Sequence, residues 1–239
     1  MRQVSSARLS DQRPFAFQFT GRKRCVIPSN GFVCSMTGII FATEDEATPF
    51  LRRYKRGRFE ELHEGETLYD SEIFLTLTGL GKIKATLRTE RFLQLHRPDR
   101  IFHIGTCTAL SENLNIGQLV AAAQVFEGDR IELATPTYPR MPLEVPFDEL
   151  RSGTLVTQDH VAKENSEKSY WQRIADISDM TGYAVAYVSA THGIPCHIVK
   201  VVTGHIHDND HQFRKNLTGA YEKIATFLMS KLSQLEEAG

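Results

Sequence analysis

Residues 37–46 read Thr-Gly-Ile-Ile-Phe-Ala-Thr-Glu-Asp-Glu, and this stretch decides the fold class. Its first six residues form an apolar run, which predicts a short strand buried on both faces. Thr43, followed three residues later by Glu46, predicts a capping box at the start of a helix. Thr48-Pro49 is an alternative start, since proline suits the first helical position. A buried strand that leads straight into a helix is typical of α/β domains.

The same alternation continues along the chain. Apolar runs and helical periodicity predict strands at 72–78, 100–104, 117–125, 153–157 and 196–203, and helices at 82–96, 179–192 and about 217–232. Segment 129–151 contains four prolines and is expected to be a loop or lid. The pattern predicts a three-layer αβα sandwich around a central mixed, mostly parallel sheet.

Composition narrows the class of protein. The net charge is −1 with 24% charged residues, so the chain has no general attraction for nucleic acid or membranes. No apolar run approaches the roughly 18 residues of a membrane span. The four cysteines lack CxxC spacing, which favours reduced thiols over disulfides or a zinc site. We therefore expect a cytoplasmic protein with no metal or other cofactor and with neither nucleic-acid nor membrane partners.

The first 35 residues differ from the rest, with six basic side chains and a single acid, Asp11. They lack the apolar core of about 7–15 residues that a secretory signal requires. An organelle transit peptide, a partly ordered extension, or sequence upstream of an original start at Met36 would each fit. We expect a basic N-terminal extension, 1–35, followed by one domain, 36–239.

Ligands of such sheets bind beyond the carboxyl ends of the strands. Four candidate segments follow predicted strands: the acids 44–46, the turn with Gly79 and Gly81, the small residues 105–109, and the helix start at Asp179. Each also has a purely structural explanation, namely helix-dipole pairing, a tight turn, close packing and an N-cap, respectively. Taken singly, none of the four identifies a function.

Together, in this order, the segments resemble the methylthioadenosine/S-adenosylhomocysteine nucleosidases and their purine and uridine phosphorylase relatives. The resemblance runs from Thr37 to about Leu232. It is carried by GIIFATEDE (38–46), TGLGKIKA (78–85), RPD (97–99), GTCTAL (105–110), LNIGQLV (114–120), GTLVTQD (153–159), DMTGYA (179–184) and IPCHIVKVVT (194–203). It implies a nucleoside substrate, cleavage of the N-glycosidic bond, and a homodimer or larger homo-oligomer. The substrate-binding positions it implies are Gly79, Gly81, Thr106, Cys107, Thr108, Val161, Asp179, Met180, Thr181 and Thr203.

Glycosidic cleavage needs an acid near the purine N7, a group that holds the ribose hydroxyls, and an activated water or a phosphate. The resemblance places Glu46 at the position of the glutamate that orients the water. Thr181 stands where the family has the ribose-binding glutamate, and Gly204 where it has the purine acid. Asp208, in the string Ile-His-Asp, would align with the purine acid if this chain had a four-residue insertion relative to the family. In the alternative alignment, which has no gap, Gly204 stays at that position.

Phosphorylases of this family carry an arginine just before the glycine cluster, but residues 102–104 are Phe-His-Ile. Hydrolysis is therefore expected rather than phosphorolysis, with phosphate left as an alternative ligand. Because Thr181 and Gly204 replace two acidic groups, a nucleoside-binding homologue with impaired catalysis is the second hypothesis. The third is a metal-dependent hydrolase that uses His205, His207, Asp208, Asp210 and His211, a string that a solvated loop would also explain.

Overall fold

The computed structural model describes residues 35–129 and 140–237. These residues belong to one compact unit, Cys34–Gly239. The expected basic extension, and residues 130–139 of the expected loop or lid, lie outside the described residues. The division at residue 35 therefore stays a prediction. Within the described residues, no helix is long and apolar enough to cross a membrane.

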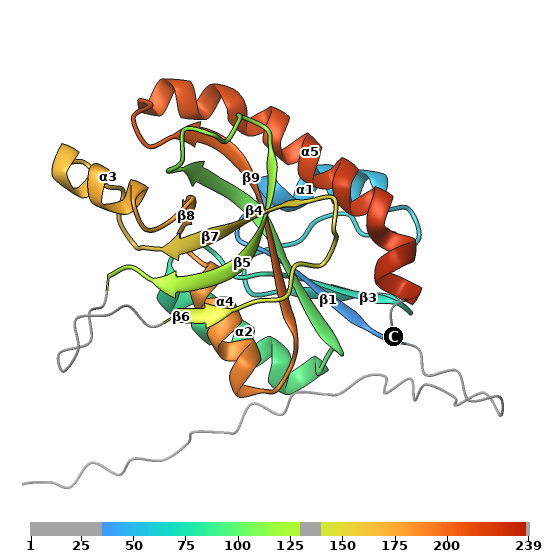
Figure 1. Cartoon of the computed structure of the whole chain (residues 1–239). Coiled ribbons are helices and arrows are strands. Elements are labelled where there is room, and N and C mark those ends of the chain that lie inside the picture. Colours follow the sequence, from blue (N-terminus) through green and yellow to red (C-terminus); the bar gives the residue numbers. More distant parts are fainter. Residues whose placement is uncertain (1–34, 130–139, 238–239) are drawn as a thin grey trace, which may run out of the picture. The chain divides into compact units, whose positions relative to one another are not determined.

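Strands and helices alternate along most of the chain, as predicted (Figure 1). The strands are β1 (Thr37–Phe41), β2 (Thr67–Tyr69), β3 (Ile73–Leu77), β4 (Arg100–Ala109), β5 (Leu119–Glu127), β6 (Arg140–Pro142), β7 (Arg151–Thr157), β8 (Ile177–Asp179) and β9 (Cys196–His205). The helices are α1 (Glu44–Arg53), α2 (Lys82–His96), α3 (Asn165–Gln172), α4 (Gly182–Thr191) and α5 (Asp210–Glu237).

The strands form one mixed sheet in the order β2-β3-β1-β4-β8-β7-β5-β6. Strand β9 lies off this path, since it pairs in parallel with β4 and antiparallel with β5. The strands β4, β8, β7, β5 and β9 therefore close into a ring. Five of the strand pairs are parallel: β1 with β3 and β4, β4 with β9, β7 with β5 and β8. The mixed, mostly parallel sheet is confirmed, whereas the ring was not foreseen.

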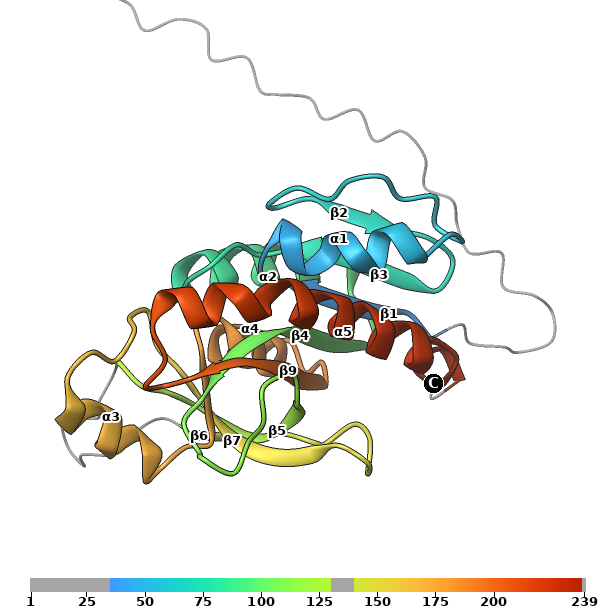
Figure 2. The same ribbon diagram turned by 90° about the horizontal axis from the view of Figure 1, so that it is seen from above.

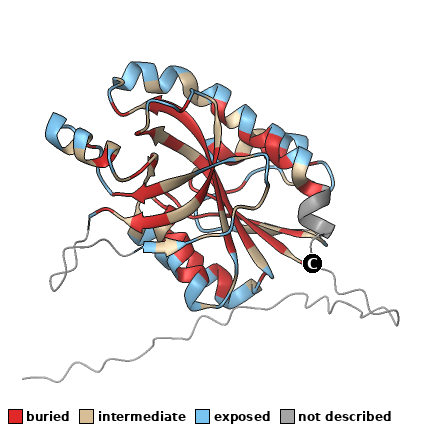
Figure 3. Cartoon of the chain, in the orientation of Figure 1, coloured by how far each residue is buried: buried red, intermediate tan, exposed pale blue. Residues whose placement is uncertain are grey.

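Helices cover both faces of the sheet, which confirms the three-layer arrangement (Figure 1), and Figure 2 looks down onto the face that carries α1 and α5. Helices α1 and α5 pack together on one face, where Phe50 and Ile224 join the first apolar cluster. Helices α2 and α4 pack on the other face, where Leu93 and Val185 join the second. The strands between them are largely buried, while the outer helical faces are exposed (Figure 3).

The junction of β1 and α1 has the predicted capping box. The Thr43 side chain accepts from the Glu46 backbone N–H, and the Glu46 carboxylate accepts from the Thr43 N–H. Pro49 lies inside α1, so the alternative helix start at Thr48 is wrong. The capping box therefore fixes the turn that places Glu46 just beyond the carboxyl end of β1.

Several boundaries differ from the predictions; the final helix, for example, begins at Asp210 and not near residue 217. Strand β4 continues to Ala109, so residues 105–109 are in the strand and not beyond it. Helix α4 starts at Gly182, and Asp179 ends strand β8 instead of opening the helix. Part of the expected loop 129–151 forms strand β6, which pairs with β5 at an edge of the sheet. Pro142 is tolerated there because an edge strand has one unpaired side.

Candidate active site

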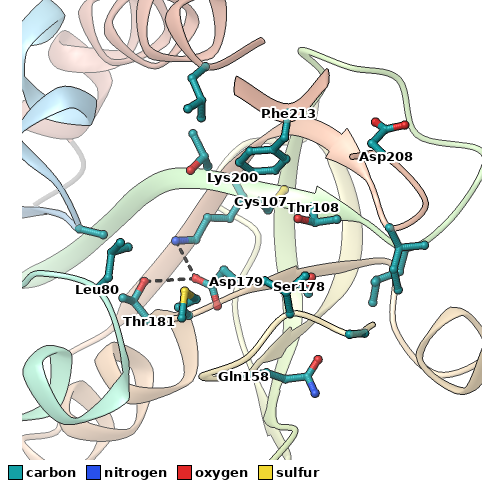
Figure 4. Close-up of a pocket in the computed structure, with 18 of the residues that line it drawn as sticks. Leu80, Cys107, Thr108, Gln158, Ser178, Asp179, Thr181, Lys200, Asp208 and Phe213 are labelled. Carbon is teal, nitrogen blue, oxygen red and sulfur yellow. Dashed lines mark hydrogen bonds and ion pairs between the residues drawn. The ribbon is translucent and has the colours of Figure 1, made fainter. Parts of the chain in front are cut away.

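A pocket of about 360 Å³ opens at the carboxyl ends of β1, β4, β7, β8 and β9 (Figure 4). This is the edge of the sheet where a ligand site was expected. Nine of the twelve predicted site residues line it: Glu46, Thr106, Cys107, Thr108, Val161, Asp179, Met180, Thr181 and Asp208. The segments chosen from four separate strand ends thus meet in one cavity.

The other three predicted residues, Gly79, Gly81 and Thr203, do not line the pocket. Both glycines have positive φ angles, +78° and +91°, and shape the turn whose middle residue, Leu80, does face the pocket. Thr203 is fully buried, and its hydroxyl donates to the Cys107 carbonyl at 2.9 Å. All three are therefore placed to support the pocket wall, in contrast to the binding roles expected for them.

The start of α2 does not offer a free anion site. Its first backbone N–H, on Lys82, donates to the Asp159 Oδ1 at 2.8 Å. The chain's own carboxylate thus occupies the position that a ligand anion would take at a helix N-terminus. The tight-turn explanation of the Gly-Leu-Gly segment fits this geometry.

Glu46 joins helix α1 to strand β4. Its Oε2 accepts from the N–H groups of Ala42 and Thr43 at 3.1 and 3.3 Å. Its Oε1 accepts from the N–H and the hydroxyl of Thr106 at 2.8 and 2.9 Å. A Cβ on Gly105 would lie 2.9 Å from Oε1, so only glycine leaves room for this carboxylate. Glu46 is thus buried, held by four donors, and still part of the pocket wall.

A buried ion pair lies at the floor of the pocket (Figure 4). The Lys200 ammonium is 2.8 Å from Asp179 Oδ2, and both side chains are at most 3% exposed. Burial alone would raise the pKa of Asp179, but the nearby Lys200 charge and the Thr157 hydroxyl help to hold that pKa below its ordinary value. Asp179 also accepts from the Gly182 N–H at 2.9 Å and so satisfies a donor at the start of α4, although the N-cap residue of that helix is Thr181 and not Asp179.

His103 completes this network as a neutral imidazole. Its Nδ1 is 3.0 Å from the Ile40 carbonyl, which can only accept, so Nδ1 carries the proton. Its Nε2 therefore accepts, with the Lys200 ammonium and the Thr181 hydroxyl both at 2.9 Å. Burial, together with the Lys200 charge, lowers the pKa of His103 to about 3. At the position where the resemblance implies a ribose-binding glutamate, the structure thus has the Thr181 hydroxyl, with the Lys200 ammonium and the His103 imidazole beside it.

Lys200 was missed as a site residue. The available signal was its position in an otherwise apolar strand, Ile198-Val-Lys-Val-Val202, because a lysine there must be paired if it is buried. The partner could not be inferred, since Asp179 is 21 residues away in the chain and comes from another strand.

Asp208 lies beside Gly204, although strand β9 contains no four-residue insertion. The strand continues through Gly204, which pairs with Thr108 after a one-residue bulge at Thr203. The turn that follows brings Asp208 back, where its Oδ2 accepts from the His205 N–H at 2.7 Å. A Cβ on Gly204 would lie 3.2 Å from that same oxygen. The carboxylate therefore fills the space that a side chain on residue 204 would enter, the position at which the resemblance implies an acid.

Two other chemistries find no support. Within the described residues, no group of three or more His, Cys, Asp and Glu side chains is placed to hold a metal ion, so the histidine-rich turn does not form the proposed metal site. Cys107 is buried, and burial raises the pKa of its thiol far above the ordinary value. A thiol that stays protonated fits a packing role and not that of a nucleophile.

Comparison with known proteins identifies the family to which the chain belongs. The model of the family described as "Phosphorylase superfamily" matches residues 36–232. The chain belongs to the phosphorylase superfamily. The match covers every strand, the pocket and most of α5, so the site described above is that of a superfamily member.

Among curated proteins, the chain is similar to the aminodeoxyfutalosine nucleosidase of Helicobacter pylori, with 23% identity over 83% of this chain and 98% of that protein. It is also similar to the 5'-methylthioadenosine/S-adenosylhomocysteine nucleosidase of Staphylococcus aureus, with 31% identity over 38% of this chain and 41% of that protein.

Solved structures of nucleosidases share the fold. The 5'-methylthioadenosine/S-adenosylhomocysteine nucleosidase of H. pylori, solved in complex with a substituted pyrrolopyrimidine–pyrrolidine compound, has a TM-score of 0.74 and 20% identity over 84% of this chain and 99% of its own. The Arabidopsis thaliana 5'-methylthioadenosine nucleosidase has a TM-score of 0.72 and 21% identity over 86% and 98%. At such identities the likeness concerns the fold.

Proposed function

We propose that this protein is a nucleosidase that hydrolyses the N-glycosidic bond of a purine or modified purine nucleoside. The observation that carries the proposal is the Asp208 carboxylate, which fills the space beside Gly204 in the same pocket as Glu46. An acid for the base and a carboxylate for the water are thus both available. The named relatives, which are nucleosidases, support the same reaction.

Each group has a definite task in this reaction. Asp208, in its protonated form, gives its proton to the purine as the bond between C1′ and the base breaks. Glu46 takes a proton from the water whose oxygen bonds to C1′, and the water replaces the Thr106 hydroxyl at Oε1. Thr181 and Lys200 lie at the floor, where they can bind the sugar hydroxyls. The products are the free base and ribose or its 5′-modified form.

Water is favoured over phosphate as the acceptor of the sugar. Among the described residues that line the pocket there is no arginine. The one lysine, Lys200, is already paired with Asp179. A phosphate would therefore meet no free cation here, and adding inorganic phosphate should leave the rate of base release unchanged.

The test follows base release from a panel of purine nucleosides. We expect Asp208→Asn and Glu46→Gln each to lower the rate by about 10²–10⁴-fold, the usual contribution of a general acid or base. Asp210→Asn is the matched control, because Asp210 is exposed at the start of α5 and outside the pocket. Full activity in the Asp208 variant would remove it from the mechanism, and no release from any nucleoside by the unaltered protein would contradict the proposal.

A nucleoside-binding homologue with impaired catalysis is the second candidate. It is favoured by the four donors that already surround Glu46 and by the hydroxyl of Thr181 in place of a carboxylate. This candidate predicts a ligand-induced rise in Tm without base release. Turnover that Glu46→Gln abolishes would exclude it.

We further propose a homo-oligomer and a cytoplasmic location. The assembly is supported by the exposed apolar side chains Leu80, Ile83 and Leu87 at the start of α2, and by Val161 nearby in the pocket wall. Leu80 also lines the pocket, so a second copy seated on this face would cover the entrance. The location is supported by the unpaired thiols of Cys107 and Cys196.

A further inference from the structure

The carboxylates of the pocket are already engaged by the protein's own donors. Among the described residues, three carboxylates line it: Glu46, Asp179 and Asp208. Glu46 has four donors, and the proposed reaction assigns it to the attacking water. Asp208 is assigned to the base and lies apart from the floor, where Asp179, Thr181 and Lys200 gather (Figure 4). A sugar bound at the floor therefore meets Asp179 as its one nearby carboxylate.

Asp179 has no lone pair left for a sugar hydroxyl. Its Oδ1 accepts from the Thr157 hydroxyl at 2.7 Å and from the Gly182 N–H at 3.1 Å. Its Oδ2 accepts from the Gly182 N–H at 2.9 Å, with the Lys200 ammonium 2.8 Å and the Thr181 hydroxyl 3.3 Å away. A carboxylate offers about four lone-pair sites. These four donors from the protein fill them.

The groups beside Asp179 can serve one sugar hydroxyl at most. Of the three N–H bonds of the Lys200 ammonium, two are engaged by Asp179 and His103, which leaves one donor. The single Thr181 proton is used by His103 or Asp179, which leaves the Thr181 oxygen as a neutral acceptor. The second hydroxyl of a vicinal diol would find no carboxylate here. A buried hydroxyl proton without an acceptor is unfavourable.

We propose that the site takes the sugar of a 2′-deoxyribonucleoside and that Thr181 is the residue that removes the requirement for a 2′-hydroxyl. A 2′-deoxyribose presents the 3′-hydroxyl alone, which matches the single donor and acceptor left at the floor. A pocket built to bind a hydroxyl strongly rejects the analogue that lacks it, whereas this floor gains little from a second hydroxyl. The inference rests on the proposed function and adds the class of sugar to it.

The test measures binding, because the electron-withdrawing 2′-oxygen makes the cleavage of ribonucleosides intrinsically slower and would bias a comparison of rates. The full chain with Asp208→Asn, which slows the proposed reaction, is titrated calorimetrically with adenosine and with 2′-deoxyadenosine. We expect 2′-deoxyadenosine to bind at least as tightly as adenosine. Adding Thr181→Glu supplies a carboxylate for the second hydroxyl, so adenosine should then bind about tenfold more tightly than 2′-deoxyadenosine.

Thr218→Glu is the matched control, because it adds the same charge at an exposed position of α5 outside the pocket. It should leave the ratio of the two affinities unchanged. Thr181→Asp, whose side chain is close to threonine in size, is the second variant and should shift the ratio in the same direction as Thr181→Glu.

Two results would overturn the sugar preference alone. One is adenosine binding more than about threefold more tightly while Thr181 is in place. The other is a ratio that neither carboxylate variant changes. Failure of both nucleosides to bind would overturn the proposed function, and the sugar preference with it.

Discussion

Single residues show how the pocket departs from the pattern that its family leads one to expect. The Thr181 hydroxyl is neutral, so it accepts hydrogen bonds from sugar hydroxyls less strongly than a carboxylate would. Its oxygen lies 2.9 Å from His103 Nε2 and 3.3 Å from Asp179 Oδ2. Lys200 supplies a charged donor beside it. In the proposed reaction the sugar would therefore meet donors in place of an acceptor, and we expect it to bind through its oxygen lone pairs.

Lys200→Met should strongly destabilise the fold. It removes the cation and leaves the Asp179 carboxylate buried without its partner, which typically costs about 3–5 kcal/mol. Urea denaturation measures the loss in the free energy of unfolding. Adding Asp179→Asn should recover part of this loss, because the double variant contains no unpaired charge. A single variant as stable as the unaltered protein would contradict the strength assigned to this pair.

At the scale of elements, a network of charges fixes the segment after β7 that forms the pocket wall. His160 Nδ1 is 3.0 Å from Asp129 Oδ1, and its Nε2 is 2.5 Å from Glu167 Oε1 on α3. Asp129 Oδ2 also accepts from the Asp159 N–H and pairs with Lys82. Only a doubly protonated imidazole can donate to both carboxylates, so the connection of α3 to β5 depends on protonation.

This contact predicts a pH dependence of stability. The hydrogen bond to Glu167, followed by the charges of Glu167 and Asp129, raises the pKa of His160 above its ordinary value of 6.5. The other charged groups of the cluster are Lys82, paired with Glu127 and Asp129, and the neighbouring Asp159. Because the folded state binds the proton more tightly, the stabilisation is complete below pH 6.5 and is lost as the pH rises through the raised pKa.

Tm measured from pH 5.5 to 9 provides the check. The difference in Tm between the unaltered protein and His160→Gln should be largest at the acid end and shrink toward zero at the alkaline end. Since His160 is half exposed, the effect should be modest. His192→Gln is the control, because His192 follows α4 and pairs with Glu90, which is not part of this network. A difference that stays constant with pH would show that His160 acts without its charge.

At the scale of the whole molecule, local sequence patterns predicted most of the helices and strands, but they did not predict which distant strands pair. The apolar run 37–42 and the capping box gave β1 and α1 because both signals lie within a few residues. Strand β8 has only three residues, and the ring closed by β9 depends on partners far away in the chain. The site followed the same rule: Glu46 and Asp179 were predicted from local motifs, but Lys200 acquires its place in the site only through a tertiary contact with Asp179.

The assembly is the property of the whole molecule that remains to be measured. Ile83 and Leu87 are one helical turn apart on α2 and are 75% and 66% exposed, and Leu80 precedes them at the pocket entrance. An apolar face of this kind is unfavourable in water, and a stable interface of about 1,200–2,000 Å² would bury it.

We expect sedimentation to show a dimer or larger species, and Ile83→Asp with Leu87→Asp to give monomers with weaker nucleoside binding. Ile116→Asp, a change of another exposed isoleucine away from α2, should keep the assembly. A monomeric unaltered protein at tens of micromolar would contradict the assembly, since it would leave this face open to solvent while the pocket works alone.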